Sequence, residues 1–142
     1  MFMYFIMLPL ISIYFNALNL ITVIHFIILM IIYTDGSGKT GRYCYLLENL
    51  GKKTVQLFEK SGITNNEAEY LAIIEALKVI TDGEICIYSD SKLVVNQLNH
   101  DYSIKEDRLR LLAKEIWDLS SHLSVKFIWV PREKNKAGKI LG

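Results

Sequence analysis

Two acidic residues in the sequence stand where they could act together on one ligand. Asp35 follows the mostly apolar run 31–34, and Asp90 follows the mostly apolar run 87–89. Both runs are typical of buried strands, and the strand ends of an α/β sheet open into a ligand crevice. We therefore expect Asp35 and Asp90 to share one crevice.

A third carboxylate is expected from the helix between these strands, where Glu67 and Glu69 compete for the position. At about 100° per residue, Glu69 heads the apolar stripe that would face the sheet. This stripe contains Ala72, Ile73, Ala76 and Ile80. Glu67 falls on the other side of the helix and is expected to face water, so Glu69 is the predicted third acid.

Each acid also has a structural explanation when it is considered alone. Asp35 could serve a turn before glycine, Asp90 could cap a helix, and Glu69 could interact with a helix dipole. Three converging carboxylates without a basic partner would repel one another and raise their pKa values, a cost that divalent cations remove. Such hard oxygen ligands suit Mg²⁺ or Mn²⁺ and in-line phosphoryl chemistry.

The elements that must position these acids follow the order βββαβααβα. This order predicts an α/β fold, a mixed five-stranded sheet with helices packed on it. Turn residues are expected at 35–38, and N-cap chemistry at 64–66. The expected strands are 27–33, 42–47, 54–60, 84–89 and 125–130, and the expected helices are 67–80, 91–99, 104–119 and a short tail from 135.

The composition indicates one domain with no large charged surface. The chain has 142 residues, and its 16 Lys and Arg against 15 Asp and Glu give a net charge of +1. This balance excludes a polybasic tail, so any contact with nucleic acid must be local. The two cysteines, Cys44 and Cys86, are too few for a disulfide scaffold and fit a reducing compartment.

Charge divides the chain at Asp35, before which no charged residue occurs. Residues 1–27 form an uncharged hydrophobic extension, and residues 28–142 form the predicted catalytic domain. The extension exceeds the ~20 residues needed to span a bilayer, and it lacks the charged start and cleavage site of a secretory signal. Three readings stay open: a non-functional leader with initiation at Met30, a membrane anchor through residues 1–26, and an ordered hydrophobic element. We expect a cytoplasmic protein, with membrane anchoring as the alternative.

Four segments in order resemble the type 1 ribonuclease H family, in particular its short, archaeal-like branch. The segments are Ile31-Ile32-Tyr33-Thr34-Asp35-Gly36-Ser37, Thr64-Asn65-Asn66-Glu67-Ala68-Glu69-Tyr70, Ile87-Tyr88-Ser89-Asp90-Ser91 and Trp129-Val130-Pro131-Arg132-Glu133-Lys134-Asn135. The resemblance runs from Ile28 nearly to the end of the chain. It implies a ribonuclease H-like fold and a metal-dependent endoribonuclease that hydrolyses the RNA strand of RNA–DNA hybrids.

The resemblance also implies roles for individual residues. Asp35 would bridge two Mg²⁺ or Mn²⁺ ions, Glu69 and Asp90 would complete the metal shells, and water would be the nucleophile. A late arginine, Arg132, would assist. The RNA–DNA hybrid would be held in its minor groove by the backbone of Gly36 and the side chains of Ser37, Asn65, Asn66, Ser91 and Lys92. No protein partner is implied, and a monomer is expected.

One departure from the family concerns a fourth catalytic acid, whose place is taken by Gly138. Glu133 is a candidate replacement. The alternative function is a weakened or inactive nucleic-acid-binding module of the same fold, although a decayed site would be free to lose Asp35, Glu69 or Asp90 as well. The sequence has lost none of these three acids.

Several other features are expected to be structural. Trp117 and Trp129 are predicted to pack in the core. A basic run on the long helix is diluted by acids and is expected to be a solvated face rather than a DNA contact. Its members are Lys105, Arg108, Arg110 and Lys114.

Overall fold

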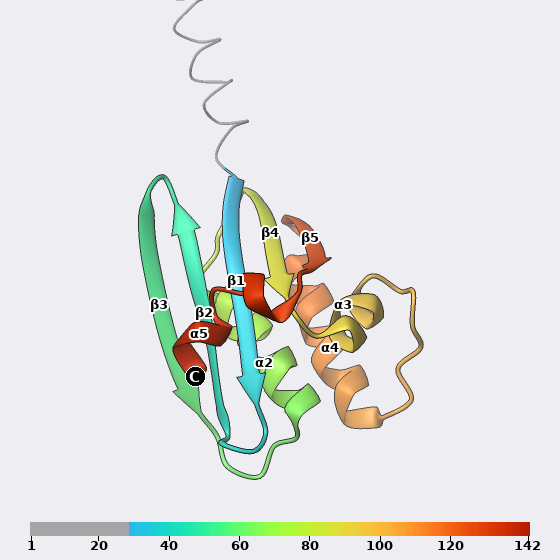
Figure 1. Cartoon of the computed structure of the whole chain (residues 1–142). Coiled ribbons are helices and arrows are strands. Elements are labelled where there is room, and N and C mark those ends of the chain that lie inside the picture. The colour runs from blue at the N-terminus through green and yellow to red at the C-terminus, as the bar shows by residue number, and fades with distance from the viewer. Residues whose placement is uncertain (1–28) are drawn as a thin grey trace, which may run out of the picture.

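The computed structural model describes residues 29–142, which contain a five-stranded sheet in the order β3-β2-β1-β4-β5 (Figure 1). The predicted extension 1–27 and residue 28 lie outside the described residues. The observed element order confirms the predicted α/β fold and adds a 3₁₀ turn, η1, before the tail helix. The elements are β1 (Leu29–Ser37), β2 (Arg42–Asn49), β3 (Lys52–Glu59), α2 (Asn65–Lys78), β4 (Glu84–Ser89), α3 (Lys92–Leu98), α4 (Asp107–Ser120), β5 (Ser124–Trp129), η1 (Arg132–Lys134) and α5 (Gly138–Leu141).

The sheet is mixed because β1 pairs with neighbours of opposite sense. It is antiparallel to β2 and parallel to β4, and β5 continues the parallel half. The parallel pairing of β1 with β4 ends with Thr34 opposite Ser89. The next residues, Asp35 and Asp90, therefore leave the paired strands at the same edge of the sheet.

The predicted turn at 35–38 is wrong over residues 35–37, which belong to β1. These residues leave β4 but stay paired with β2, since Asp35 lies opposite Cys44 and Ser37 lies opposite Arg42. The hairpin partner thus extends the strand past its parallel neighbour. As a result, the backbone that carries Asp35 is held on one side and open on the other.

The core lies between the sheet and α2 and α4, which pack together on one face (Figure 1). Apolar residues of α2 form one buried cluster with inward-facing residues of β1 and β4, as the helical stripe predicted. The largest buried members are Tyr70, Ile73, Ile74 and Leu77 from α2, and Ile32, Ile85 and Ile87 from the sheet. Burying this stripe sets the rotation of α2, and with it the direction of Glu69.

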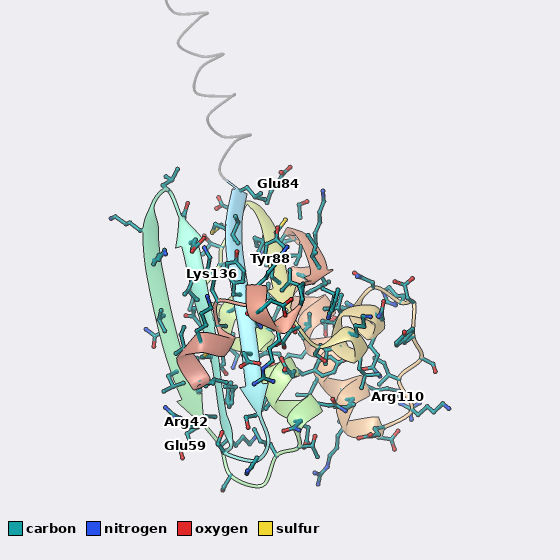
Figure 2. The ribbon with its side chains drawn as sticks, in the orientation of Figure 1. Arg42, Glu59, Glu84, Tyr88, Arg110 and Lys136 are labelled. Carbon is teal, nitrogen blue, oxygen red and sulfur yellow. The ribbon has the colours of Figure 1, made fainter. Side chains whose placement is uncertain are left out.

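The tail crosses the opposite face of the sheet, where η1 and α5 lie over β1 and β2 (Figure 1). Buried Asn135 fixes it there: its Nδ2 donates to the Thr34 carbonyl at 2.9 Å, and its Oδ1 accepts from the Ala137 N–H at 3.1 Å. Lys136 lies on the same face (Figure 2), with its Nζ 2.6 Å from Glu48 Oε1. The tail is thereby fastened beside Asp35.

The two tryptophans differ in their surroundings. Trp117 is partly buried and packs against the core, as predicted. Trp129 is 40% exposed, so its predicted core position is wrong. It ends β5, an edge strand, and edge positions are covered from one side only.

Two further sequence expectations can be compared with the fold. Cys44 and Cys86 are both buried free thiols. Among residues 29–142, none of the helices is long and apolar enough to cross a membrane.

Candidate active site

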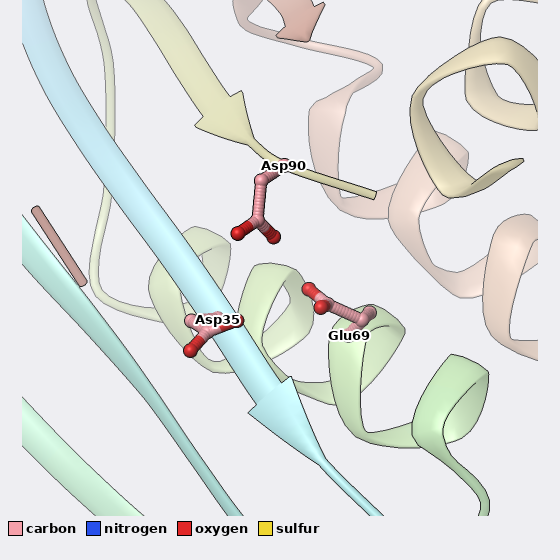
Figure 3. Close-up of side chains that lie close together, drawn as sticks. All are labelled: Asp35, Glu69 and Asp90. Carbon is pink, nitrogen blue, oxygen red and sulfur yellow. The ribbon is translucent and has the colours of Figure 1, made fainter. Parts of the chain in front are cut away.

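Three carboxylates from separate elements meet at the edge where the parallel strands end. Asp35 comes from β1, Glu69 from α2, and Asp90 from the turn after β4 (Figure 3). One oxygen of each lies within 4.8 Å of the others. Asp35 and Glu69 are buried, whereas Asp90 is half-buried. The structure therefore brings together the three acids that the sequence singled out.

Glu69 is aimed at the sheet because the start of α2 is fixed by a capping box. Thr64 Oγ1 accepts from the Glu67 N–H at 3.1 Å, and the Glu67 carboxylate accepts from the Thr64 N–H at 2.7 Å. The N-cap chemistry predicted at 64–66 is thus supplied by Thr64. With its first turn fixed, the helix directs the Glu69 side chain to its buried face.

The expectation that Glu67 faces water is wrong. The residue is only 9% exposed, because its carboxylate turns back to cap the helix. Arg108 from the start of α4 also lies 3.5 Å from Glu67 Oε1. Capping and this ion pair lower the pKa of Glu67. Helical phase correctly separated the two glutamates, but it could not show that the first turn recruits Glu67.

Asp35 and Glu69 approach closely because glycine lies between their backbones. A β-carbon on Gly36 would lie 2.4 Å from the Ala68 carbonyl carbon and 2.6 Å from the Glu69 nitrogen, well inside van der Waals contact. Glycine at position 36 therefore lets β1 pack directly on α2. Any larger residue there would push the two carboxylates apart.

Asp90 is not used as a helix cap, which was its structural explanation. Ser91 caps α3, with its Oγ accepting from the Val94 N–H at 3.3 Å. Ser89 Oγ accepts from the Ser91 N–H at 3.1 Å and donates to Glu69 Oε2 at 3.5 Å. The serines on either side carry the local hydrogen bonds, and the Asp90 carboxylate is left to the acid cluster.

The electrostatics of the cluster favour protons or cations. Burial raises the pKa of Asp35, and the charge of Asp90 raises it further. A hydrogen bond from the Gly36 backbone and the charge of Arg132 lower this pKa, but they do not cancel the rise. Burial also raises the pKa of Glu69 well above its ordinary value, with Asp35 and Asp90 adding to the effect. None of the ion pairs within residues 29–142 includes any of the three acids. Their negative charge is therefore uncompensated by a close basic partner.

A pocket of about 230 Å³ opens beside the cluster. Predicted site residues lining it are Asp35, Gly36, Ser37, Asn65, Glu69 and Arg132. Thr40 also lines it, and nothing in the sequence marks this residue beyond its place in a turn. A larger hollow of about 480 Å³ between α3 and α4 contains none of the three acids.

The remaining predicted binding residues lie outside this pocket. Asn66 is half-buried at the start of α2, Ser91 caps α3, and exposed Lys92 places its Nζ 4.6 Å from the centre of the Trp129 ring. Within the pocket, Asn65 Oδ1 accepts from the Gly38 N–H at 2.6 Å. Its side-chain NH₂ group can still donate to a ligand.

Gly138 lies close to the acid cluster, whereas Glu133 does not join it. A β-carbon on Gly138 would stand 3.6 Å from Asp35 Oδ2. Glu133 is exposed in η1 and is not one of the clustered acids. The geometry therefore does not support Glu133 as a replacement for a fourth acid.

Comparisons with known proteins are consistent with this geometry. Residues 46–141 match the family described as reverse transcriptase-like. A ribonuclease H of Caldicellulosiruptor saccharolyticus is 37% identical over 105 residues, which are 70% of this chain and 68% of the relative. A putative hydrolase, EbsB, of Enterococcus faecalis is 32% identical over 122 residues, which are 78% of this chain and 88% of the relative.

Solved structures share the same architecture. The N-terminal RNase H domain of a Mycobacterium tuberculosis protein superimposes with a TM-score of 0.66 at 25% identity, covering 81% of this chain and 91% of the other. LC11-RNase H1, solved in complex with an RNA/DNA hybrid, gives a TM-score of 0.63 at 26% identity, covering 80% of this chain and 99% of the other.

Proposed function

The chain belongs to the ribonuclease H family, and from this membership we propose that it is a metal-dependent endonuclease that hydrolyses the RNA strand of RNA–DNA hybrids. The observation that carries the proposal is the convergence of Asp35, Glu69 and Asp90, whose ligand oxygens lie within 4.8 Å of one another. The relative LC11-RNase H1 was solved with an RNA/DNA hybrid, which supports the same substrate class here.

The donor set fits two Mg²⁺ or Mn²⁺ ions. All three side chains offer only hard carboxylate oxygens, the ligand type that both ions prefer. The raised pKa values of Asp35 and Glu69 reflect burial and mutual repulsion, which nearby positive charge would relieve. When bound, divalent cations supply an activated water and stabilise the negative charge that develops on the phosphate.

The chain's own residues then hold the reacting groups. Asp35, Glu69 and Asp90 would hold the two ions through their carboxylate oxygens. Each carboxyl group must give up its proton before it can act as a ligand. Arg132 lines the pocket, and its charge lowers the pKa of Asp35, so its guanidinium is suited to a phosphate of the RNA strand.

Selection of RNA would come from small polar groups that contact 2′-hydroxyls in the minor groove. Asn65 and Ser37 line the pocket together with Gly36, so their polar groups are available for such contacts. Asn66, Ser91 and Lys92 would extend the contact along the hybrid. This set holds little positive charge, in keeping with a chain of net charge +1.

The test is cleavage of a labelled RNA–DNA hybrid by the purified chain with Mg²⁺ or Mn²⁺. We expect cuts in the RNA strand, none in double-stranded DNA, and none after chelation. Binding without cleavage in either metal would reject this proposal. It would support the non-catalytic binding module, a function that the absence of a carboxylate at Gly138 favours.

A further inference from the structure

The exposed Trp129 makes two contacts with the segment 90–92, one with Asp90 and one with Lys92. Its indole Nε1 donates to the Asp90 carbonyl at 3.1 Å. Its ring lies under Lys92, with the Nζ 4.6 Å from the ring centre. One side chain at the end of β5 therefore touches both the residue that carries the acid and the first residue of α3.

The Asp90 carbonyl has no donor from the regular structure around it. The β4–β5 ladder ends with Ser89 opposite Trp129, and α3 begins only after its cap, Ser91. Asp90 lies between these two ladders. The indole N–H is thus the donor that satisfies the Asp90 carbonyl, while the N–H of the same peptide, that of Ser91, donates to Ser89 Oγ at 3.1 Å. The direction of the Asp90 side chain depends on how these two bonds hold the peptide.

Lys92 carries its positive charge at a position that the dipole of its own helix disfavours. It is the first residue of α3, at the positive end of the helix dipole. The electron-rich face of an indole attracts an ammonium group. Among residues 29–142, Lys92 forms no ion pair with an acid. Its ammonium group therefore lies on the Trp129 ring and does not pair with Asp90.

We infer that Trp129 is a positioning residue of the site, which fixes the backbone of Asp90 through its indole N–H and holds the Lys92 ammonium through its ring. The inference rests on the proposed function, because it assigns the indole N–H to metal binding and the ring contact with Lys92 to hybrid binding. Loss of the N–H misplaces one acid of the cluster. Loss of the ring frees the Lys92 ammonium group, which would otherwise be held in place to contact the substrate.

Two Trp129 variants separate these effects in the full chain. Trp129→Phe keeps an aromatic face and removes the N–H, so we expect affinity for Mn²⁺, measured calorimetrically without substrate, to fall about threefold to tenfold. Its affinity for a fluorescent RNA–DNA hybrid in EDTA should stay within about twofold. Trp129→Leu should weaken both, and Lys92→Met should weaken hybrid binding alone.

Trp117 provides a matched control, because its indole Nε1 also donates to a backbone carbonyl at 3.1 Å, that of Leu98. Trp117→Phe loses the same kind of bond away from the acids and should bind Mn²⁺ as the wild type does. Equal Mn²⁺ affinity in Trp129→Phe and wild type would overturn the inference, as would equal weakening in Trp117→Phe. If Trp129→Leu fails to fold, the phenylalanine variant decides.

These measurements are separate from the test of the proposed function. A wild-type chain that binds Mn²⁺ but leaves hybrids intact rejects the nuclease, while the Trp129 comparison still stands or falls on Mn²⁺ affinity. A wild-type chain that cleaves hybrids, with Trp129→Phe unaltered in Mn²⁺ binding, keeps the nuclease and rejects the role of Trp129.

Discussion

Gly138 faces Asp35 across the tail and sheet, so that a β-carbon at position 138 would stand 3.6 Å from Asp35 Oδ2. The tail is held in this place by the buried bond of Asn135 to the Thr34 carbonyl. A carboxylate introduced at 138 would therefore reach the acid cluster. Because Gly138 supplies no carboxylate beside Asp35, a substitution at position 138 can test whether a fourth acidic ligand improves metal binding.

We predict that Gly138→Asp lowers the concentration of Mg²⁺ or Mn²⁺ needed for half-maximal cleavage. The new side chain adds an oxygen ligand, so fewer waters must hold the ion. The wild type should depend more on Mn²⁺, which tolerates irregular shells better than Mg²⁺. Activity would be titrated against each metal. Gly138→Asn is the control for shape without charge, and an unchanged or increased metal requirement in the aspartate variant would contradict the prediction.

We predict unequal effects at the paired glutamates. Glu69→Gln removes a buried carboxylate from the cluster and should lower the cleavage rate by orders of magnitude. Glu67→Gln should change it only a few-fold, because glutamine can still accept the Thr64 N–H in the capping box. Single-turnover rates at saturating metal measure the difference. Similar losses in both variants would show that Glu69 has no special place.

We predict that the chain without metal loses stability as the pH rises. The pKa of Glu69 is raised well above 4.5 and that of Asp35 is also raised, so burial favours their protonated forms. Stability is fully present below the ordinary carboxyl pKa and is lost as the pH rises through the raised values. Melting temperatures in EDTA should therefore fall from about pH 5 to about pH 8.

Glu69→Gln should flatten this decline and raise the melting temperature at the upper end, since the amide carries no charge to desolvate. Saturating Mn²⁺ should flatten it in the wild type by neutralising the cluster. A wild-type decline that persists in Mn²⁺ would have to arise outside the three acids.

We predict that Gly36→Ala damages both stability and activity. The added methyl group would meet the Ala68 carbonyl carbon at 2.4 Å, so β1 must move away from α2. Such overpacking costs about 1–3 kcal/mol, and it separates Asp35 from Glu69. Denaturant unfolding and hybrid cleavage would be measured together.

Gly51→Ala supplies the comparison. Gly51 has a backbone that favours glycine, with φ at +78°, but nothing lies within 4 Å of its β-carbon position in the β2–β3 turn. Its variant should lose about 1–2 kcal/mol from backbone strain and keep full activity. If Gly36→Ala cleaved hybrids as well as Gly51→Ala does, close packing at Gly36 would not control the site.

The acid cluster was predictable because it follows from periodicity and from the point where β1 and β4 stop pairing, although β1 itself continues to Ser37. Asp35 and Asp90 each follow a short apolar run, and the stripe on α2 placed Glu69 toward the sheet. These signals are local in the sequence. They predict the site correctly when the strands and helices that they define pack together in the expected order.

The features missed by the sequence depend on contacts between distant segments. The exposure of Trp129 follows from β5 being an edge strand, and a strand's place in the sheet order cannot be read from its own residues. The position of the tail depends on the hydrogen bond from Asn135 to the Thr34 carbonyl, which lies in β1, far away in the sequence. Glu67 was misplaced because a cap and Arg108 compete with helical phase.

The parallel pairing of β1 with β4 also sets when the acids can meet during synthesis. A ribosome delivers β1, β2 and β3 first, and these strands can pair in sequence as hairpins. Asp90 follows β4, which joins β1 only after α2 has been made. A nascent chain that stops before β4 therefore lacks one carboxylate of the cluster. Under the proposed function, the growing polypeptide stays inert toward the nucleic acid around the ribosome until most of the domain has emerged.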